Sequence, residues 1–201
     1  MTRDFVKRAA RGAAFVAVSP FLLSFVVRRR LLGADRALQS SSQTLSLVPG
    51  LAGQYLRRAF LAIALDGCAS TAVVEFGTTF SQHAARLDEH VYVGPNCTLG
   101  RVHLERDVLI ASGVHIPSGA HTHGTSDTVV PIREQADGRR LVRIGAGSWI
   151  GARAVILADV GRNCVVGAGA VVTTAVPDDS VAVGVPARVV RSRARSCASS
   201  F

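Results

Sequence analysis

The most regular feature of this sequence is a six-residue period of apolar positions that runs from residue 74 to residue 172. Each unit opens on an apolar residue, and a small residue or valine recurs four places later. The opening residues are Val74, Phe80, Leu87, Val93, Leu99, Leu104, Ile110, Ile116, Ile144, Ile150, Ile156, Val160, Val166 and Val172. The residues four places later include Thr78, Ala84, Val91, Cys97, Val108, Val114, Ala120, Ser148, Ala154, Cys164 and Ala170.

A period of six matches neither the turn of an α-helix nor the alternation of a long strand. It matches a coil with three short sides, in which each side sends one apolar side chain inward and successive coils stack these chains in columns. So many units in near-register disfavour a β-sandwich with accidental periodicity. We therefore expect an all-β fold, a parallel β-helix of hexapeptide repeats with an N-terminal helical extension. The period alone does not fix the handedness of the coil.

The N-terminal part begins with an uncharged stretch, Gly12–Val27, that has basic residues on both sides. The stretch is shorter than the roughly 20 residues that a spanning helix needs, and Pro20 should kink it. Arg28–Arg30 stand where a signal peptide would have its cleavage site. We expect a helix on the cytoplasmic face of the inner membrane. The alternative is that this helix packs on the body of the protein or on a sister subunit.

Two further segments connect this stretch to the repeats. The serine-rich segment Gln39–Pro49 is expected to be a loop. The segment Gln54–Leu65 is expected to be a helix, with Leu56, Phe60, Ile63 and Leu65 on one apolar face and Arg57 and Arg58 off it. The expected organisation is a helical extension over residues 1–66, a β-helix over 67–191 with a loop insertion over 121–143, and a basic flexible tail over 192–201.

Composition and charge narrow the choice of partners. Hydrophobic residues make up 48% of the chain but aromatic residues only 5%, which suits a core of many small layers. The net charge of +9 and the basic residues at both ends favour phosphate groups or an acidic membrane surface as partners. No nucleic-acid motif accompanies this charge, so no nucleic-acid partner is expected. The four cysteines form no CxxC pair, so no metal site is expected, and Cys97 and Cys164 should be reduced core residues of a cytoplasmic protein.

The repeat breaks once, between Ala120 and Arg143, and the break begins with His121-Thr122-His123-Gly124. Extruding a loop from a regular solenoid costs conformational entropy, so a loop that carries two histidines is a candidate functional site. Neutral histidine can act as a general base, because its pKa lies near working pH. The other histidines, at positions 83, 90, 103 and 115, are expected to be surface residues.

Several stretches resemble the hexapeptide-repeat acetyltransferases. They are VYVGPNCTLG (91–100), DVLIASGVHIPSG (107–119), IGAGSWIGARAVI (144–156), VVGAGAVVTTAVP (165–177) and VAVGVPARVVR (181–191). The resemblance is to the branch of O-acetyltransferases for colanic acid and other exopolysaccharides, alongside the galactoside, maltose and nodulation-factor enzymes. It covers roughly residues 66–191. It implies a left-handed β-helix, a homotrimer, acetyl-CoA as donor, and a hydroxyl acceptor on a small or lipid-linked saccharide.

The resemblance also assigns roles to residues of the histidine loop. The acyl transfer that it implies needs a base for the hydroxyl proton and a hydrogen-bond donor for the developing oxyanion. The catalytic base of the family follows the last regular repeat before this loop. Counted from Ile116, that position is His121; judged by the glycine that follows, it is His123, which we favour slightly. The family often has an acidic or polar residue before the histidine, and Ala120 here leaves its orienting partner open.

The resemblance also assigns residues to the oxyanion and to acetyl-CoA, the acyl donor. The match after Trp149 and Gly151 implies that the backbone N–H of Ala152 holds the oxyanion. The pantetheine is implied to lie along Gly167, Ala168 and Gly169, and Arg188 and Arg191 are implied to lie near the CoA phosphates, where the planar guanidinium binds well. The alternative is that these are turn glycines and a solvated basic tail. Val185 stands where the family usually has asparagine.

Two other functions share this kind of solenoid. A γ-class carbonic anhydrase would bind zinc through three histidines from adjacent subunits to activate water. The family's histidine pair has four residues between its members, whereas His115 and His121 have five and His121 and His123 have one. A non-catalytic scaffold would need neither the histidine loop nor the coenzyme-like C-terminal motif. We therefore expect an enzyme, an acetyl-CoA-dependent O-acyltransferase.

Overall fold

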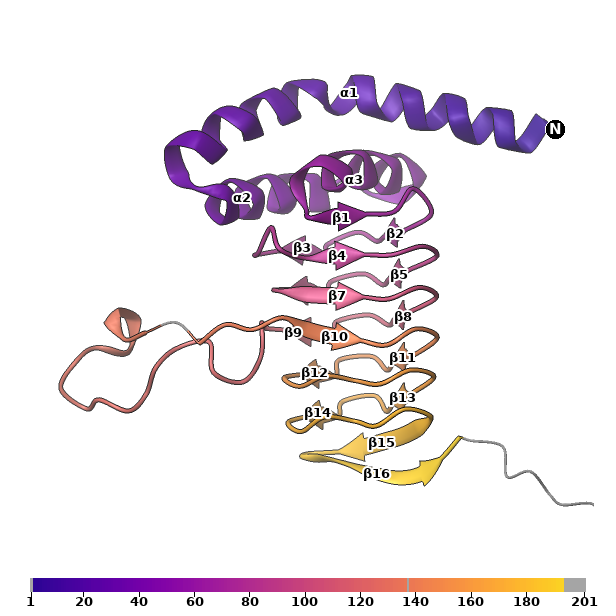
Figure 1. Cartoon of the computed structure of the whole chain (residues 1–201). Helices are drawn as coiled ribbons and strands as arrows, with labels where there is room; N and C mark the ends of the chain where they lie inside the picture. The colour runs from indigo at the N-terminus through magenta and orange to yellow at the C-terminus, as the bar shows by residue number, and fades with distance from the viewer. Residues whose placement is uncertain (1, 137, 194–201) are drawn as a thin grey trace, which may run out of the picture.

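The computed structural model describes residues 2–136 and 138–193. Asp137 and residues 194–201, including Arg195, Cys197 and most of the expected basic tail, lie outside the described residues. Three helices come first and a β-solenoid of about six turns follows (Figure 1). The expected all-β solenoid with a helical extension is therefore confirmed. From β4 in front the chain passes to the strands behind and descends in a left-handed sense.

The solenoid has three faces, each made by one sheet. Face A contains β1 (Gly67–Cys68), β4 (Arg86–Leu87), β7 (Val102–Leu104) and β10 (Val142–Ile144). Face B contains β2 (Val73–Val74), β5 (Tyr92–Val93), β8 (Leu109–Ile110), β11 (Trp149–Ile150), β13 (Val165–Val166), β15 (Ser180–Gly184) and β16 (Ala187–Ser192). Face C contains β3 (Thr79–Phe80), β6 (Thr98–Leu99), β9 (His115–Ile116), β12 (Val155–Ile156) and β14 (Val171–Val172). Neighbouring strands pair in parallel, except that β15 and β16 form an antiparallel hairpin at the C-terminal end.

The interior columns follow the predicted period. Every predicted opening residue is at most 2% exposed, from Val74 through Val172. A fully buried aliphatic side chain of this size contributes about 1.5–3 kcal/mol, so the stacked columns form the main core. Two small-residue assignments were wrong. Because the spacing slips before Leu87, the buried residue of that unit is Ala85 and not Ala84. Ala120 is exposed, since it follows the end of β9 and belongs to the excursion from the coils.

The three helices form a helical cap on the first coil: α1 (Thr2–Leu32), α2 (Ala34–Ser46) and α3 (Gly50–Ala64). The expected loop at Gln39–Pro49 was wrong, since most of it belongs to α2. Serine is a weak helix former because its hydroxyl competes for backbone groups. Here those hydroxyls bond within the helix, as Ser41 does to the carbonyl of Ala37 at 2.9 Å. The Ser42 hydroxyl accepts the Phe80 N–H at 2.8 Å, which ties α2 to the first coil.

The expected helix at Gln54–Leu65 is confirmed as α3, but its burial differs from the expectation. Arg57 and Arg58 are buried, at 2% and 6% exposure, whereas Ile63 is 51% exposed. Arg57 is accommodated because it donates to the backbone carbonyls of Val74, Leu45 and Val48 at 2.9, 3.2 and 2.6 Å. The apolar pattern placed the face wrongly because it took both arginines as solvent-facing.

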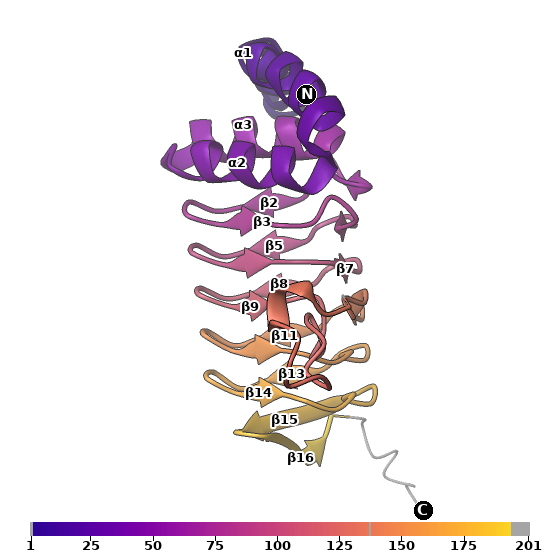
Figure 2. The ribbon, with the colours of Figure 1, turned by 90° about the vertical axis from the view of Figure 1, so that its left-hand side faces the viewer.

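Helix α1 is the outermost element at this end of the molecule (Figure 2). Its stretch Arg8–Leu32 is long and apolar enough, by length and composition alone, to cross a membrane, and 17% of its most apolar window is buried. One stripe packs on the rest of the cap: Ala14, Val18 and Phe25 are buried, and the Phe25 ring meets the Phe60 ring edge-on at 5.3 Å. The other faces of α1 expose apolar side chains, which are Phe5, Phe15, Val16, Phe21, Leu23, Val26, Val27, Leu31 and Leu32. The packing alternative therefore holds for one stripe of the helix only.

Candidate acyl-transfer site

Within the described residues the solenoid breaks once, at an excursion between β9 and β10 that projects away from the coils (Figures 1 and 2). It starts a few residues earlier than the expected 121–143, since β9 ends at Ile116, and it contains one short 3-10 helix at Ile132–Glu134. Its root is closed by a hydrogen bond from the Arg140 N–H to the Ser118 carbonyl at 2.9 Å. The excursion therefore starts and ends at the corner where face C meets face A.

Local hydrogen bonds give the excursion its shape. The Asp127 carboxylate accepts the backbone N–H groups of Val129 and Val130 at 2.7 and 3.1 Å, and these bonds lower the pKa of Asp127. The Gln135 amide donates to the carbonyls of Asp127 and Val130 at 2.7 and 2.8 Å. These bonds join the two sides of the loop beyond its root. Its tip exposes apolar side chains, with Val129 89% and Ile132 57% exposed.

His121 and His123 lie at the root of this excursion, and both are exposed. Neither imidazole has a hydrogen bond or ion pair with any residue in the described ranges. The carboxylate partner that Ala120 left open is thus not supplied by the described part of the same chain. Both rings are accessible to a substrate or to a second subunit.

The proposed oxyanion donor lies at a different corner, where face B meets face C. The register of the coils stacks Pro95, Ser112, Ala152 and Ala168 at this corner, because Gly94, Ala111, Gly151 and Gly167 each donate to the carbonyl of the next coil. The Ala152 N–H has no hydrogen-bond acceptor among the described residues. A donor that protein groups leave free at a partly exposed corner is suited to an oxyanion.

The glycines proposed to line the pantetheine have structural reasons to be glycine. A Cβ on Gly151 would come within 2.5 Å of the Ala168 nitrogen, and one on Gly167 within 2.7 Å of a Val183 methyl. Gly169 has φ +67° and open space around it, and its N–H donates to the Ala152 carbonyl at 2.8 Å. The structure thus brings Gly151, Ala152 and Gly167–Gly169 to one edge, where the coils approach closely and the outside is open.

The other residues expected to bind acetyl-CoA lie beside or below this edge. Trp149 is 49% exposed on face B, in register with Leu109 and Val165. Arg188 and Arg191 are exposed on β16, the last strand of face B. No charged partner holds either guanidinium among the residues described, so both are available for phosphate.

One chain does not bring the histidines and Ala152 together. Ala152 precedes β12 and the histidines follow β9, so the two groups stand at opposite edges of face C. The face spans about six residues, which at about 3.3 Å per residue is roughly 20 Å. The two halves of the expected site are therefore separated by the width of a face within a single subunit.

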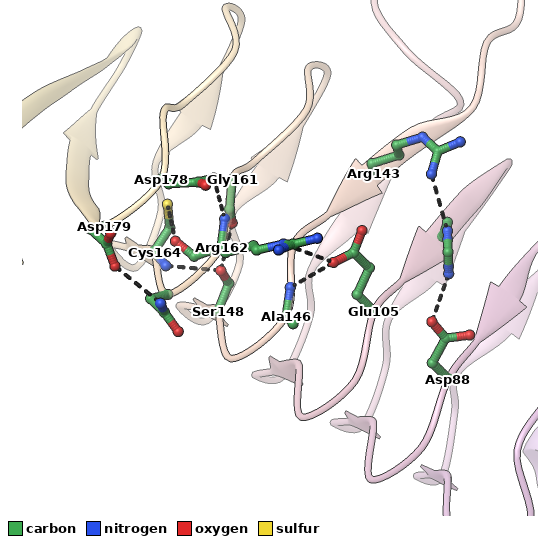
Figure 3. A network of polar contacts seen from close by, with 12 residues as sticks. Asp88, Glu105, Arg143, Ala146, Ser148, Gly161, Arg162, Cys164, Asp178 and Asp179 are labelled. Carbon is green, nitrogen blue, oxygen red and sulfur yellow. Dashed lines mark hydrogen bonds and ion pairs between the residues drawn. The ribbon is translucent and has the colours of Figure 1, made fainter.

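Face A carries a polar network that the sequence analysis missed (Figure 3). His103 Nε2 lies 2.8 Å from Asp88 Oδ2 and its Nδ1 lies 3.5 Å from Arg143, so this ring is held on both sides. Its side chain is only 16% exposed. His83 is likewise bound to Asp35, at 2.6 Å. The expectation that His90 and His115 are exposed is confirmed, but His83 and His103 are partly buried and paired. The register between coils places these partners together, and that register is visible only in the structure.

The same figure shows how carboxylates close the corner between faces A and B. Glu105 accepts the Ala146 N–H at 3.1 Å, and Asp178 accepts the Arg162 N–H at 2.7 Å. These N–H groups stand at second places of their corners, as the Ala152 N–H does at its own. Among the residues that the structure describes, no group of three or more His, Cys, Asp or Glu lies close enough to hold a metal ion.

The repeat region is similar in sequence to known hexapeptide-repeat proteins. Residues 141–174 match the family described as the hexapeptide repeat of succinyl-transferase. A Mycobacterium tuberculosis protein named as an acetyltransferase is 45% identical over 73 residues, which cover 35% of this chain and 24% of that protein. An Escherichia coli protein named as a lipopolysaccharide-biosynthesis O-acetyltransferase is 32% identical over 124 residues, which cover 57% of this chain and 61% of that protein. The solenoid resembles the hexapeptide-repeat acetyltransferase family.

A solved structure extends the likeness in fold. The hexapeptide-repeat acetyltransferase from Vibrio cholerae superposes with a TM-score of 0.65 at 22% identity, covering 79% of this chain and 92% of that chain. This likeness concerns the fold. The chain spans about a quarter of the length of the first of the two curated relatives and about three-fifths of the second.

Proposed function

We propose that this protein is an acetyl-CoA-dependent O-acetyltransferase that acylates a hydroxyl of a saccharide or glycan precursor by direct transfer. The observation that carries the proposal is the single excursion of an otherwise regular hexapeptide solenoid. It sets His121 and His123 at one edge of face C, while the opposite edge holds the N–H of Ala152, and none of these three groups has a hydrogen-bond partner among the described residues. The E. coli relative named for lipopolysaccharide O-acetylation supports a saccharide acceptor.

In the proposed reaction, the imidazole of His123 or His121 takes the proton of the acceptor hydroxyl as its oxygen bonds to the thioester carbonyl carbon. The Ala152 N–H donates to the carbonyl oxygen, which carries the negative charge of the tetrahedral intermediate. When the carbonyl re-forms, the carbon–sulfur bond breaks. The sulfur takes the proton back from the imidazolium, so CoA leaves as the thiol and the ester stays on the acceptor.

This reaction requires a second subunit, because one chain keeps the base and the oxyanion donor at opposite edges of face C. A threefold ring would bring the excursion of one chain against the Ala152 edge of its neighbour. Two exposed apolar surfaces support such contact. One is the tip of the excursion, and the other is the outward ladder Tyr92, Leu109 and Trp149 on face B, which the register stacks.

The membrane contact of the proposed enzyme would lie at the cap end. The exposed side chains Val16, Leu23, Val27 and Leu31 recur at spacings of seven and four, so they share one face of α1. Basic residues flank this face, and each one near an anionic surface contributes about 1 kcal/mol. Since α1 is outermost in Figure 1, a flat membrane could meet it while the solenoid points away. Lipid-linked saccharides would then be near at hand.

The test incubates the purified full-length protein with acetyl-CoA and candidate glycans. We expect release of the CoA thiol that depends on the glycan, and a mass gain of one acetyl group on the glycan. If the protein neither releases the CoA thiol nor binds acetyl-CoA, the proposal is refuted. Bound zinc together with hydration of carbon dioxide would favour the carbonic-anhydrase alternative instead.

A further inference from the structure

A pocket of about 340 Å³ lies between the helical cap and the first two coils. Its lining includes Arg11 from α1, Tyr55 and Arg58 from α3, and Thr71 and His90 from the corners between faces A and B. The volume is at the lower end of the range of small-ligand pockets, about 300–1,000 Å³. The pocket is far along the chain from the histidine excursion and shares no residue with the candidate acyl-transfer site.

The unusual member of this pocket is Arg58. Arg58 is 6% exposed, and its Nη2 atom is buried without a hydrogen-bond partner in the described chain. Nor does its side chain form an ion pair or hydrogen bond anywhere in the described chain. Burying a charge without a partner is costly, so a folded protein rarely keeps one without a use. The Nη2 atom of the neighbouring Arg57 is also buried without a partner, but its Nε and Nη1 atoms donate to three backbone carbonyls, whereas no atom of the Arg58 guanidinium has a partner in the described chain.

The surroundings of Arg58 supply no negative charge. Burial lowers the pKa of Arg58, and the positive charge of Arg11 lowers it further. The pocket lining contains no aspartate or glutamate. The thiol of Cys68 is close, but burial raises its pKa to about 11, so it stays protonated near neutral pH. Two arginines therefore converge on one pocket with nothing anionic between them.

We propose that this pocket binds the phosphate group of a phosphate ester. The guanidinium groups of Arg58 and Arg11 would supply charge and paired N–H donors, the arrangement that binds phosphate best. The Tyr55 hydroxyl and the His90 ring, which have no hydrogen-bond partner among the described residues, could add further donors. The phosphate could belong to a phospholipid headgroup under α1 or to a free, water-soluble compound. This proposal does not rest on the acyl-transfer activity.

The first arm of the test uses full-length protein and inorganic phosphate. We expect phosphate to raise the Tm by several degrees over chloride at equal ionic strength, because a ligand that binds only the folded state stabilises it. Arg58→Met, which keeps the apolar stem, should lose this rise, and Arg11→Gln should weaken it. The matched control Arg36→Met removes an exposed arginine of α2 and should respond as the wild type does. An Arg58→Met protein that still gains the full phosphate-dependent rise would overturn the proposal.

The second arm separates the two sources of phosphate. Protein is sedimented with phosphatidylcholine vesicles with and without phosphatidic acid, in the presence and absence of inorganic phosphate. If the source is a headgroup, binding to the acidic vesicles should fall severalfold in Arg58→Met and on adding phosphate. If the source is a soluble compound, the Tm response remains but vesicle binding is the same in Arg58→Met and wild type. A protein with neither response has no such site.

Discussion

Arg57 and Arg58 are adjacent in α3 and both are buried, yet their surroundings give them different roles. Arg57 donates to three carbonyls that belong to α2, the α2–α3 turn and β2, so it joins the helical cap to the first coil. Arg58 lines a pocket, and its guanidinium has no partner in the described chain. The sequence shows two identical residues side by side. Only the packing of α3 separates a structural arginine from a ligand-binding one.

Replacing Arg57 with methionine should destabilise the protein strongly. The substitution keeps much of the apolar stem but removes the arginine donor from the carbonyls of Val74 and Val48, at about 1–3 kcal/mol for each unsatisfied group. We expect the free energy of unfolding to fall by about 3 kcal/mol or more in urea titrations. Arg36→Met, on the exposed face of α2, should change it by less than about 0.5 kcal/mol. Equal effects in the two variants would contradict the bridging role of Arg57.

Replacing both His121 and His123 with alanine should cut turnover by roughly 10²–10⁴-fold, the usual worth of general-base catalysis. Acetyl-CoA binding, measured by calorimetry, should be retained because neither imidazole is among the groups proposed to hold the coenzyme. The single variants show which ring is the base. Arg133→Ala, at an exposed position of the same excursion, serves as the control and should leave turnover unchanged. Near-normal turnover in the double variant would show that neither His121 nor His123 is the catalytic base.

At the scale of elements, the solenoid could be predicted and the helical cap only in part. The coil repeats one simple requirement, an inward apolar side chain at each sixth residue, so its pattern survives without knowledge of neighbours. Helix α2 has no such pattern: its serines are accommodated by bonds within the helix and to Phe80, which depend on docking. The position of the histidine loop followed from the break in the repeat. The separation of its histidines from Ala152 did not, because it depends on which face each corner bounds.

The docking of α2 should depend on pH through Asp35, whose carboxylate accepts the His83 N–H at 2.9 Å and contacts the ring at 2.6 Å. Burial raises the pKa of Asp35, but the bonds and charge from His83 outweigh burial and lower it overall. A carboxyl with a lowered folded-state pKa stabilises the fold above its unfolded value of about 3.9, and this contribution is lost as the pH falls through the folded-state pKa. Wild-type stability should therefore fall below about pH 4.

Asp35→Asn should remove this part of the acid dependence and should be less stable than the wild type near neutral pH. Urea titrations between pH 3 and pH 7 measure both effects, with Asp107→Asn as the control. Asp107 is an exposed carboxyl at φ +61°, a conformation that asparagine accepts. If Asp35→Asn keeps the full acid dependence of the wild type, the Asp35–His83 contact is not what ties α2 to the coil.

At the scale of the whole molecule, the chain is layered along the solenoid axis. The cap and its basic pocket lie at one end, the histidine excursion leaves near the middle, and the β15–β16 hairpin closes the other end (Figure 1). The exposed apolar side chains concentrate on α1, on the tip of the excursion and on face B. Such surfaces are uncommon on a protein that works alone. The arrangement suits a membrane at the cap end and sister subunits along the sides.

A shared active site can be tested by mixing two inactive variants. Ala152→Pro removes the N–H proposed to hold the oxyanion, and the corner should tolerate proline because Pro95 occupies the same corner position two coils earlier. We expect Ala152→Pro to lower turnover by roughly 10²-fold or more. Ser112→Pro, one coil away at a corner N–H that is equally free in the described chain, is the matched control and should stay active.

If the base of one subunit serves the Ala152 edge of its neighbour, subunits of Ala152→Pro and of the His121/His123 double alanine variant should complement each other. In a threefold ring with equal random mixing, three-quarters of the assemblies contain both kinds of subunit, and each of those has one interface with both groups intact. That gives one active interface in four, so about a quarter of wild-type turnover should return after co-refolding. Sedimentation of the mixture should show a trimer. A fully active monomer, or a mixture as inactive as its parents, would place the base and the oxyanion donor in the same subunit or outside these residues.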